Sequence, residues 1–103
     1  MDDITLVIPA KNEAESLPTV LDELLKYNIK KIIVIPSEDK KTREAIEKFG
    51  CKILSQEGKG FGNALIQGIN SVETKYFCIF NADGSFDPIY LSQLKNKIEL
   101  NQD

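Results

Sequence analysis

The sequence predicts an α/β fold, a parallel sheet of about four strands with helices on both faces. Short runs of β-branched residues alternate along the chain with stretches whose apolar residues recur at helical spacing. The short runs are almost continuously apolar, which is typical of strands buried on both faces of a parallel sheet. The helices between them are long enough for the right-handed crossovers that join parallel strands.

The N-terminal third predicts a strand followed by a helix. The run at residues 4–8 is stopped by Pro9, as expected for a buried strand. In the helix that follows, Ser16 is a candidate N-cap and Pro18 falls in the first turn, where no N–H is needed. The inward face of this helix is formed by apolar residues at helical spacing: Leu17, Val20, Leu21, Leu24 and Leu25.

The rest of the chain repeats this pattern. A second strand at residues 32–35 is stopped by Pro36, and Gly50 ends a second helix in a position that suits a left-handed C-cap. The remaining elements are a weaker strand at 51–54, a helix after the glycine-rich segment 58–62, a strand at 76–80 and a last helix from Pro88. No repeat or linker interrupts this order, so residues 1–103 are expected to form a single Rossmann-like domain.

The composition excludes several classes of protein. With 42% hydrophobic and 28% charged residues and a net charge of −3, the chain is an ordinary globular domain, and its scattered lysines and arginines argue against nucleic-acid binding. The longest apolar stretch, residues 32–36, is far too short to cross a membrane. No leader peptide is expected, because Asp2 and Asp3 follow Met1 where a basic region and an apolar run would stand. Cys51 and Cys78 lie outside any metal or redox motif and are expected to be buried free thiols in a cytoplasmic protein.

Polar and glycine-rich segments follow each predicted strand. Ligands of open parallel sheets bind outside the carboxyl ends of the strands, where such segments meet. The sequence therefore predicts one binding site at this edge, built from four segments: residues 10–13, 37–39, 58–62 and 81–85.

The glycine-rich segment at 58–62 is neither a P-loop nor a dinucleotide fingerprint. Lys59 lies between its glycines with no Gly-Lys-Ser/Thr following, the third fingerprint glycine is replaced, and the segment follows the third strand instead of the first. Two interpretations stay open: a backbone and lysine that approach an anion at a helix N-terminus, or a flexible loop with a solvated lysine.

Asp83 is the candidate metal ligand. It lies just beyond a buried strand and is followed by Gly84 and Ser85, a setting that suits an oxygen ligand for Mg²⁺ or Mn²⁺ on a diphosphate. The alternative is a turn in which the aspartate only caps the next element.

Three of these segments, in this order and spacing, resemble glycosyltransferase family 2, especially its polyprenyl-phosphate (dolichol-phosphate) sugar synthases. They are Leu-Val-Ile-Pro-Ala-Lys-Asn-Glu at 6–13, Gly-Lys-Gly at 58–60 and residues 76–88, so the resemblance covers nearly the whole chain. It implies the N-terminal half of a GT-A fold, the half that binds a nucleoside diphosphate sugar.

The resemblance also implies roles for individual residues on the nucleoside side. Four of them would line the nucleoside pocket, with Glu13 on the ribose or base, and Lys59 would approach the diphosphate or position its loop. Ser37 stands where the family usually has a base-reading acid, which leaves the donor nucleotide open. The four pocket residues are Pro9, Ala10, Asn12 and Glu13.

On the metal side, Asn81 and Asp83 occupy the Asp-x-Asp positions of the family. Asp83 would hold Mg²⁺ or Mn²⁺ and so act in catalysis by activating the leaving diphosphate, and Ser85 falls where some relatives place another polar residue near the metal. Asn81 replaces the first acid, which should weaken metal affinity because one negative charge is missing.

The expected function is metal-assisted transfer of a sugar from a nucleoside diphosphate sugar to an acceptor such as polyprenyl phosphate, at the cytosolic face of a membrane. The acceptor half of the family is not in this chain, so a truncated domain is expected. A non-catalytic nucleotide-sugar-binding module, or a partner subunit, is the alternative. A homodimer through an exposed sheet edge is a further expectation, and a nucleotidyltransferase is a third interpretation, disfavoured because no glycine follows the first strand.

Overall fold

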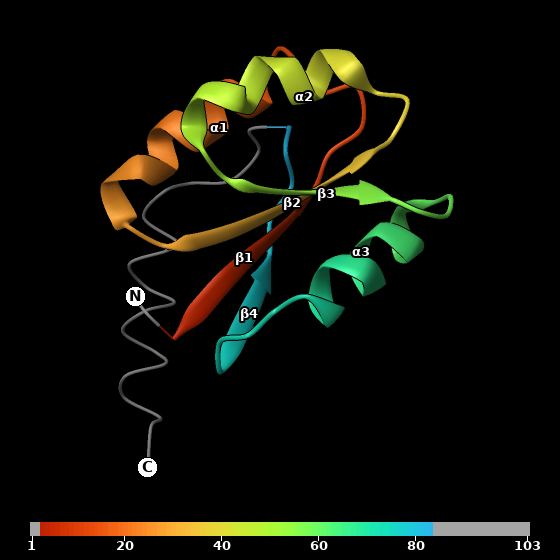
Figure 1. The fold of residues 1–103 in the computed structure, drawn as a ribbon. Coiled ribbons are helices and arrows are strands. Elements are labelled where there is room, and N and C mark those ends of the chain that lie inside the picture. The colour runs from red at the N-terminus through yellow and green to blue at the C-terminus, as the bar shows by residue number, and fades with distance from the viewer. Residues whose placement is uncertain (1–2, 84–103) are drawn as a thin grey trace.

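The computed structural model describes residues 3–83, in which four strands alternate with three helices (Figure 1). Two helices continue into single 3₁₀ turns, α1 through Leu25–Tyr27 and α2 through Glu47–Phe49. The last helix predicted from Pro88 lies outside the described residues. In chain order the elements are β1 (Ile4–Pro9), α1 (Leu17–Leu24), β2 (Lys30–Pro36), α2 (Lys40–Ile46), β3 (Lys52–Gln56), α3 (Phe61–Asn70) and β4 (Tyr76–Ile79).

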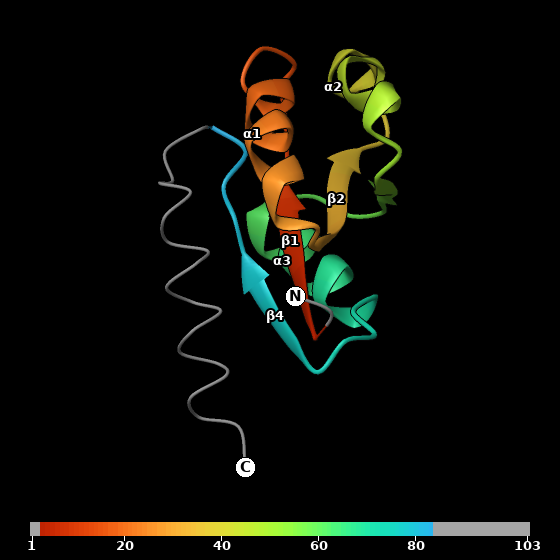
Figure 2. The same ribbon diagram turned by 90° about the vertical axis from the view of Figure 1, so that its left-hand side faces the viewer.

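The four strands form one parallel sheet in the order β3-β2-β1-β4. Helices α1 and α2 lie side by side on one face (Figure 2), and α3 covers the other face, against β1 and β2. The predicted fold class is therefore confirmed. Because β2 and β4 flank β1 on opposite sides, the strand order reverses at β1, and the crevice at this reversal is where open α/β sheets bind ligands.

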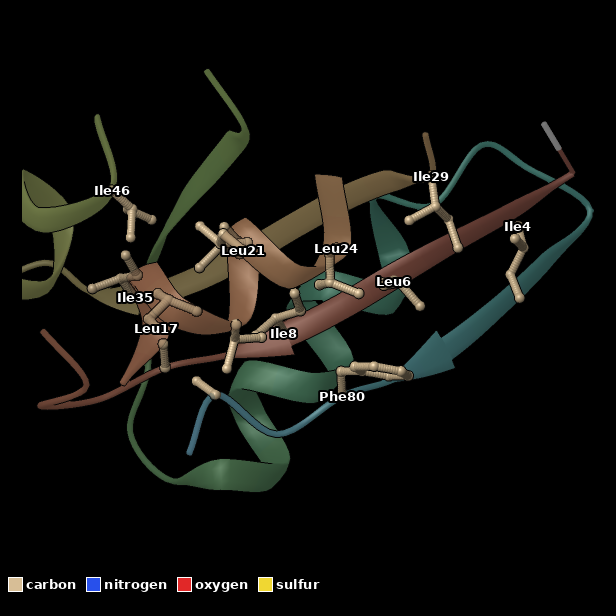
Figure 3. Packing of buried hydrophobic residues seen from close by; sticks show 14 residues of the cluster. Ile4, Leu6, Ile8, Leu17, Leu21, Leu24, Ile29, Ile35, Ile46 and Phe80 are labelled. Atoms are coloured by element: carbon tan, nitrogen blue, oxygen red, sulfur yellow. The ribbon is translucent and has the colours of Figure 1, made fainter. Parts of the chain in front are cut away.

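The larger core lies between the sheet and the pair α1 and α2 (Figure 3). Leu6 and Ile8 of β1 and Ile33 and Ile35 of β2 alternate with residues that face α3, so each strand is buried on both sides. Each such side chain contributes about 1.5–3 kcal/mol by leaving water. The inward stripe of α1 meets them with Leu17, Val20, Leu21 and Leu24, all at most 2% exposed.

The smaller core lies under α3, where the helix backbone approaches the sheet closely. Ile32, Val34 and Ala64 are buried there. A Cβ atom on Gly68 would come within 2.5 Å of Val7 Cγ1 and 3.1 Å of Val34 Cγ2. Gly68 is therefore required by the close packing of α3 on β1 and β2.

Three details of the sequence prediction need correction. Leu25, predicted on the inward face of the first helix, begins the 3₁₀ turn after α1 and is 58% exposed. Ser16 occupies the N-cap position of α1, but its backbone is helical and its side chain makes no capping hydrogen bond. Cys51 and Cys78 are free thiols, as predicted, but they are half-buried and not fully buried. Even this partial burial raises the pKa of both thiols, although Lys31 opposes the rise at Cys51.

Candidate functional site

A large cavity opens at the carboxyl ends of the strands. Its volume is about 540 Å³, and its lining comes from the loops after β1, β2, β3 and β4. The four predicted segments therefore meet at one place. Six of the predicted site residues line it: Pro9, Ala10, Glu13, Lys59, Asn81 and Asp83.

Of the other three predicted residues, two lie elsewhere in the described part of the chain. Asn12 and Ser37 are exposed and are not among the residues that line this cavity. Ser85 lies outside the described residues. Asn12 has a structural role instead. Its φ of 57° lies in the left-handed region, so the loop after β1 turns there without a glycine.

The conformation of this loop is held by side chains at the start of α2. Asn12 donates its backbone N–H to Asp39 Oδ2 at 2.7 Å, and Glu13 donates its own to Thr42 Oγ1 at 3.1 Å. Asp39 also caps α2 by accepting from the Thr42 amide at 3.2 Å and from its hydroxyl at 2.7 Å. Burial alone would raise the pKa of Asp39, but these hydrogen bonds and nearby Lys11 outweigh it and lower the pKa below its ordinary value.

Ser16 joins the loop after β1 to the loop after β4. Its hydroxyl lies within hydrogen-bond distance of the Glu13 carboxylate and 2.7 Å from the carbonyl oxygen of Ala82. A hydroxyl has a single hydrogen, so it donates to one of these acceptors at a time. The carbonyl belongs to the residue immediately before Asp83, and Ala82 itself is only 4% exposed.

Side-chain amides bind the backbone on both sides of the glycine-rich loop. Gln56 donates through Nε2 to the carbonyl oxygen of Gly60 at 2.9 Å and to Asn63 Oδ1 at 3.1 Å. Asn63 in turn occupies the space beside Gly58, where a Cβ atom would come within 2.4 Å of Asn63 Nδ2. Gly60, with a φ of 92°, turns the chain into α3.

Gln67 of α3 fixes the other side of the same loop. Its amide nitrogen donates to the Ser55 carbonyl oxygen at 2.7 Å, and its amide oxygen accepts from the Glu57 N–H at 3.0 Å. These backbone groups are two residues apart on β3 and its extension, so Gln67 binds this outer strand as a neighbouring strand would. Lys59 is therefore carried by a loop that is fixed at both ends.

The cavity combines cationic, anionic and aromatic groups. Lys11 and Lys59 bring positive charge, and Asp83 brings an exposed carboxylate at the end of the β4 loop. Phe61 is 60% exposed beside them, so its ring is available to a planar group. This set suits a ligand that has both a planar ring and a phosphate chain.

The metal prediction can be tested against the donor atoms present. Among residues 3–83 there is no group of three or more His, Cys, Asp or Glu side chains that could hold a metal ion. Mg²⁺ and Mn²⁺ are commonly held by one or two carboxylates plus phosphate oxygens of the substrate. The exposed carboxylate of Asp83 lies on the wall of a cavity with room for a ligand. It therefore fits a metal site that is completed by phosphate oxygens of the substrate.

Sequence reasoning missed the residues that organise the loops. The sequence predicts Ser16 as a helix cap and indicates no role for Gln56, Gln67 or Thr42. One signal was readable: Asp39 lies three residues before Thr42 at the start of a helix, which is a capping pattern. Bonds between residues far apart in the sequence, such as that of Ser16 with Ala82, leave no local pattern.

Comparison with known proteins finds a family model that matches nearly the whole chain. The model of the family described as Glycosyl transferase family 2 matches residues 5–103. An uncharacterized glycosyltransferase of Mycobacterium bovis is 28% identical over 102 residues, covering 99% of this chain and 46% of the relative. Glycosyltransferase AglJ of Haloferax volcanii is 25% identical over 88 residues, 84% of this chain and 29% of the relative. The chain thus spans less than half the length of these curated relatives.

Solved structures with the same fold include two kinds of enzyme. Glucosyl-3-phosphoglycerate synthase from Mycobacterium tuberculosis, solved with Mn²⁺, uridine diphosphate and glucosyl-3-phosphoglycerate, superposes with a TM-score of 0.79 at 19% identity, over 99% of this chain and 41% of that one. A 4-diphosphocytidyl-2C-methyl-D-erythritol synthase superposes with a TM-score of 0.80 at 14% identity, over 98% and 56%. At these identities the likeness concerns the fold alone.

Proposed function

This chain belongs to glycosyl transferase family 2, and from that premise we propose that its cavity binds a nucleoside diphosphate sugar, whose sugar is then transferred to an acceptor. The observation that carries the proposal is the convergence of all four strand-end loops on one cavity of about 540 Å³. That volume lies within the range of about 300–1,000 Å³ typical of small-molecule sites.

The donor would lie across the ends of the strands. The nucleoside would contact Pro9 and Ala10, with the Glu13 carboxylate as an acceptor for ribose or base N–H and O–H groups. The diphosphate would lie near Lys59, whose loop is held by Gln56 and Gln67. Fixed charges of this kind stabilise the negative charge that develops on a leaving diphosphate.

Asp83 would hold the divalent cation, with Asn81 as a neutral neighbour on the same loop. When bound, Mg²⁺ or Mn²⁺ supplies Lewis-acid neutralisation of the diphosphate. The mycobacterial synthase with the same fold was solved with Mn²⁺ and uridine diphosphate, which supports this choice of ion and ligand. Asp83 itself would contribute a carboxylate oxygen at the cavity wall.

Ligand-observed NMR with UDP-, GDP- and CDP-sugars, each with and without Mn²⁺, tests the proposal. We expect at least one nucleotide sugar to bind, more tightly with metal, and Asp83→Ala to remove only the metal-dependent gain. Asp22→Ala, on the exposed side of α1, is the matched control and should leave both affinities unchanged. If no nucleotide sugar binds to the folded chain, the assignment of the cavity is wrong.

The acceptor and the assembly are finer parts of the same proposal. The acceptor would be a polyprenyl phosphate at the cytosolic face of a membrane, as the resemblance to polyprenyl-phosphate sugar synthases implies. None of the helices within residues 3–83 is long and apolar enough to cross a membrane. Retention of the protein on vesicles that carry a polyprenyl phosphate, and not on vesicles without it, would support this acceptor, and equal retention would contradict it.

A homodimer through a sheet edge would use β4 and not β3. The backbone of β3 at Ser55 and the following Glu57 is already bound by Gln67, whereas β4 is the outer strand on the other side of the described sheet. Sedimentation velocity decides this point: a monomer at every concentration tested would contradict it.

A further inference from the structure

Ser16 lies where the two halves of the proposed donor site meet. Its hydroxyl is shared between the Glu13 carboxylate, on the nucleoside side, and the Ala82 carbonyl oxygen, on the metal side. The Glu13 end is itself fixed, because the Glu13 N–H is bound by Thr42, whose side chain is fully buried. When the Ser16 hydroxyl donates to the Ala82 carbonyl oxygen, it ties the start of α1 to the residue before Asp83.

The hydroxyl of Ser16 is not needed to start α1. The residue has helical backbone angles, with φ −91° and ψ −36°, and its side chain makes no hydrogen bond to the amides of the first turn. Pro18 in that turn also lacks an N–H to be capped. Removal of the hydroxyl should thus affect the two loops and leave the helix in place.

We infer that Ser16 is a positioning residue that holds Asp83 in the orientation required to bind the metal with the donor diphosphate. This inference rests on the proposed function. Neither the motifs that resemble the family nor a helix cap accounts for this role of Ser16. The link acts through the backbone, because Ser16 binds the carbonyl of Ala82 and not the carboxylate of Asp83.

The expected size of the effect follows from the loss of one hydrogen bond. Without it the loop after β4 samples further orientations, and the apparent affinity falls in proportion to the fraction that stays competent. A hydrogen bond worth about 0.5–1.5 kcal/mol corresponds to a loss of about 2- to 12-fold. Loss of the bond to Ala82 should fall on the metal-dependent part of the affinity, whereas loss of the bond to Glu13 should fall on the affinity measured without metal.

The test measures the affinity for a nucleotide sugar with and without Mn²⁺ in the full chain. Ser16→Ala should reduce the gain in affinity produced by Mn²⁺ by about 2- to 12-fold, whereas Ser16→Thr, which keeps a hydroxyl, should restore most of it. Ser71→Ala is the matched control, since that hydroxyl binds the Gln67 carbonyl oxygen at 3.3 Å, at the far end of α3. An unchanged gain in Ser16→Ala, or an equal loss in Ser71→Ala, would overturn the inference.

A second readout needs no ligand and separates this inference from the proposed function. Amide hydrogen exchange at Ala82 and Asp83 should be faster in Ser16→Ala than in the wild type and near normal in Ser16→Thr. If the wild type binds no nucleotide sugar but the exchange rates behave in this way, the positional link holds and the function assigned to the site is wrong. Unchanged exchange rates in Ser16→Ala would show that no such link exists.

Discussion

Asp39 and Asp83 are both aspartates at the carboxyl end of the sheet, and their surroundings give them different properties. Asp39 accepts three hydrogen bonds, from the Asn12 amide and from the amide and hydroxyl of Thr42. Asp83 is exposed on the cavity wall, where it can reach a ligand. The first is suited to hold a loop in place and the second to bind a cation.

Asp39 holds the loop through hydrogen bonds to its carboxylate, so its contribution to the stability of the protein should depend on pH. Its hydrogen bonds favour the charged form, and they lower the pKa of Asp39 in the folded protein despite its burial. The stabilisation is therefore complete above the unfolded pKa of about 3.9 and is lost as the pH falls through the lower folded value. Asp39→Asn keeps one acceptor oxygen for the cap but replaces the other by an NH2 donor, so it loses at least one of these bonds. The loss should cost about 0.5–1.5 kcal/mol at neutral pH.

Urea unfolding of wild type and Asp39→Asn at neutral pH and at about pH 2 checks this. The difference in the free energy of unfolding should shrink at low pH. Glu38→Gln is the adjacent control, because its carboxylate makes only a 3.5 Å contact with Ser37. A difference that is the same at both pH values would mean that the charge of Asp39 contributes nothing.

At this scale the sequence predicts the residues that line the cavity better than those that hold its loops. Lys59 and Asp83 were predicted from their place after strands, and both line the cavity. Asn12 was predicted to contact the nucleoside, yet it lies outside the cavity lining and its amide binds Asp39. Which way a loop side chain points depends on partners distant in sequence, and a single sequence does not reveal these.

At the scale of elements, the position of α3 is decided by a glycine. Gly68→Ala should destabilise the protein by about 1–3 kcal/mol, because the added methyl group would meet Val7 at 2.5 Å and Val34 at 3.1 Å. Both are β-branched side chains of buried strands and have little freedom to move.

Gly62→Ala is the matched control in the same helix, since nothing lies within 4 Å of a Cβ atom there. It should leave stability unchanged or raise it slightly, because alanine favours helix over glycine. Chemical denaturation of both variants gives the comparison. A Gly68→Ala protein as stable as Gly62→Ala would show that α3 does not approach the sheet as described.

The elements themselves were predicted well because local patterns determine them. Pro9 and Pro36 end β1 and β2, and Gly50 adopts the left-handed conformation expected of a C-cap, with φ 65°. The sequence predicts the third strand slightly early, at 51–54, whereas β3 runs from Lys52 to Gln56. Ser55 and Gln56 are polar, so the sequence does not indicate that the strand continues through them. Their backbone is nevertheless paired with β2, and Gln67 binds the Ser55 carbonyl oxygen.

For the whole molecule, the fold brings the loops together but leaves the reaction open. Because the four described strands are parallel, their carboxyl ends all lie at one edge of the sheet. The same architecture is found in a synthase solved with uridine diphosphate and Mn²⁺ and in 4-diphosphocytidyl-2C-methyl-D-erythritol synthase. The family match, and not the fold, therefore supports sugar transfer over nucleotidyl transfer.

A cation held by one protein carboxylate and by diphosphate oxygens should bind weakly until the nucleotide is present. Paramagnetic broadening of amide signals by Mn²⁺, measured with and without the nucleotide sugar that binds most tightly, tests this central claim most directly. We predict that the nucleotide sugar makes the broadening stronger and concentrates it at Lys59 and at residues 81–83, and that Asp83→Asn abolishes this change. Broadening that is unaffected by the nucleotide sugar, or that persists at the same residues in Asp83→Asn, would contradict the account.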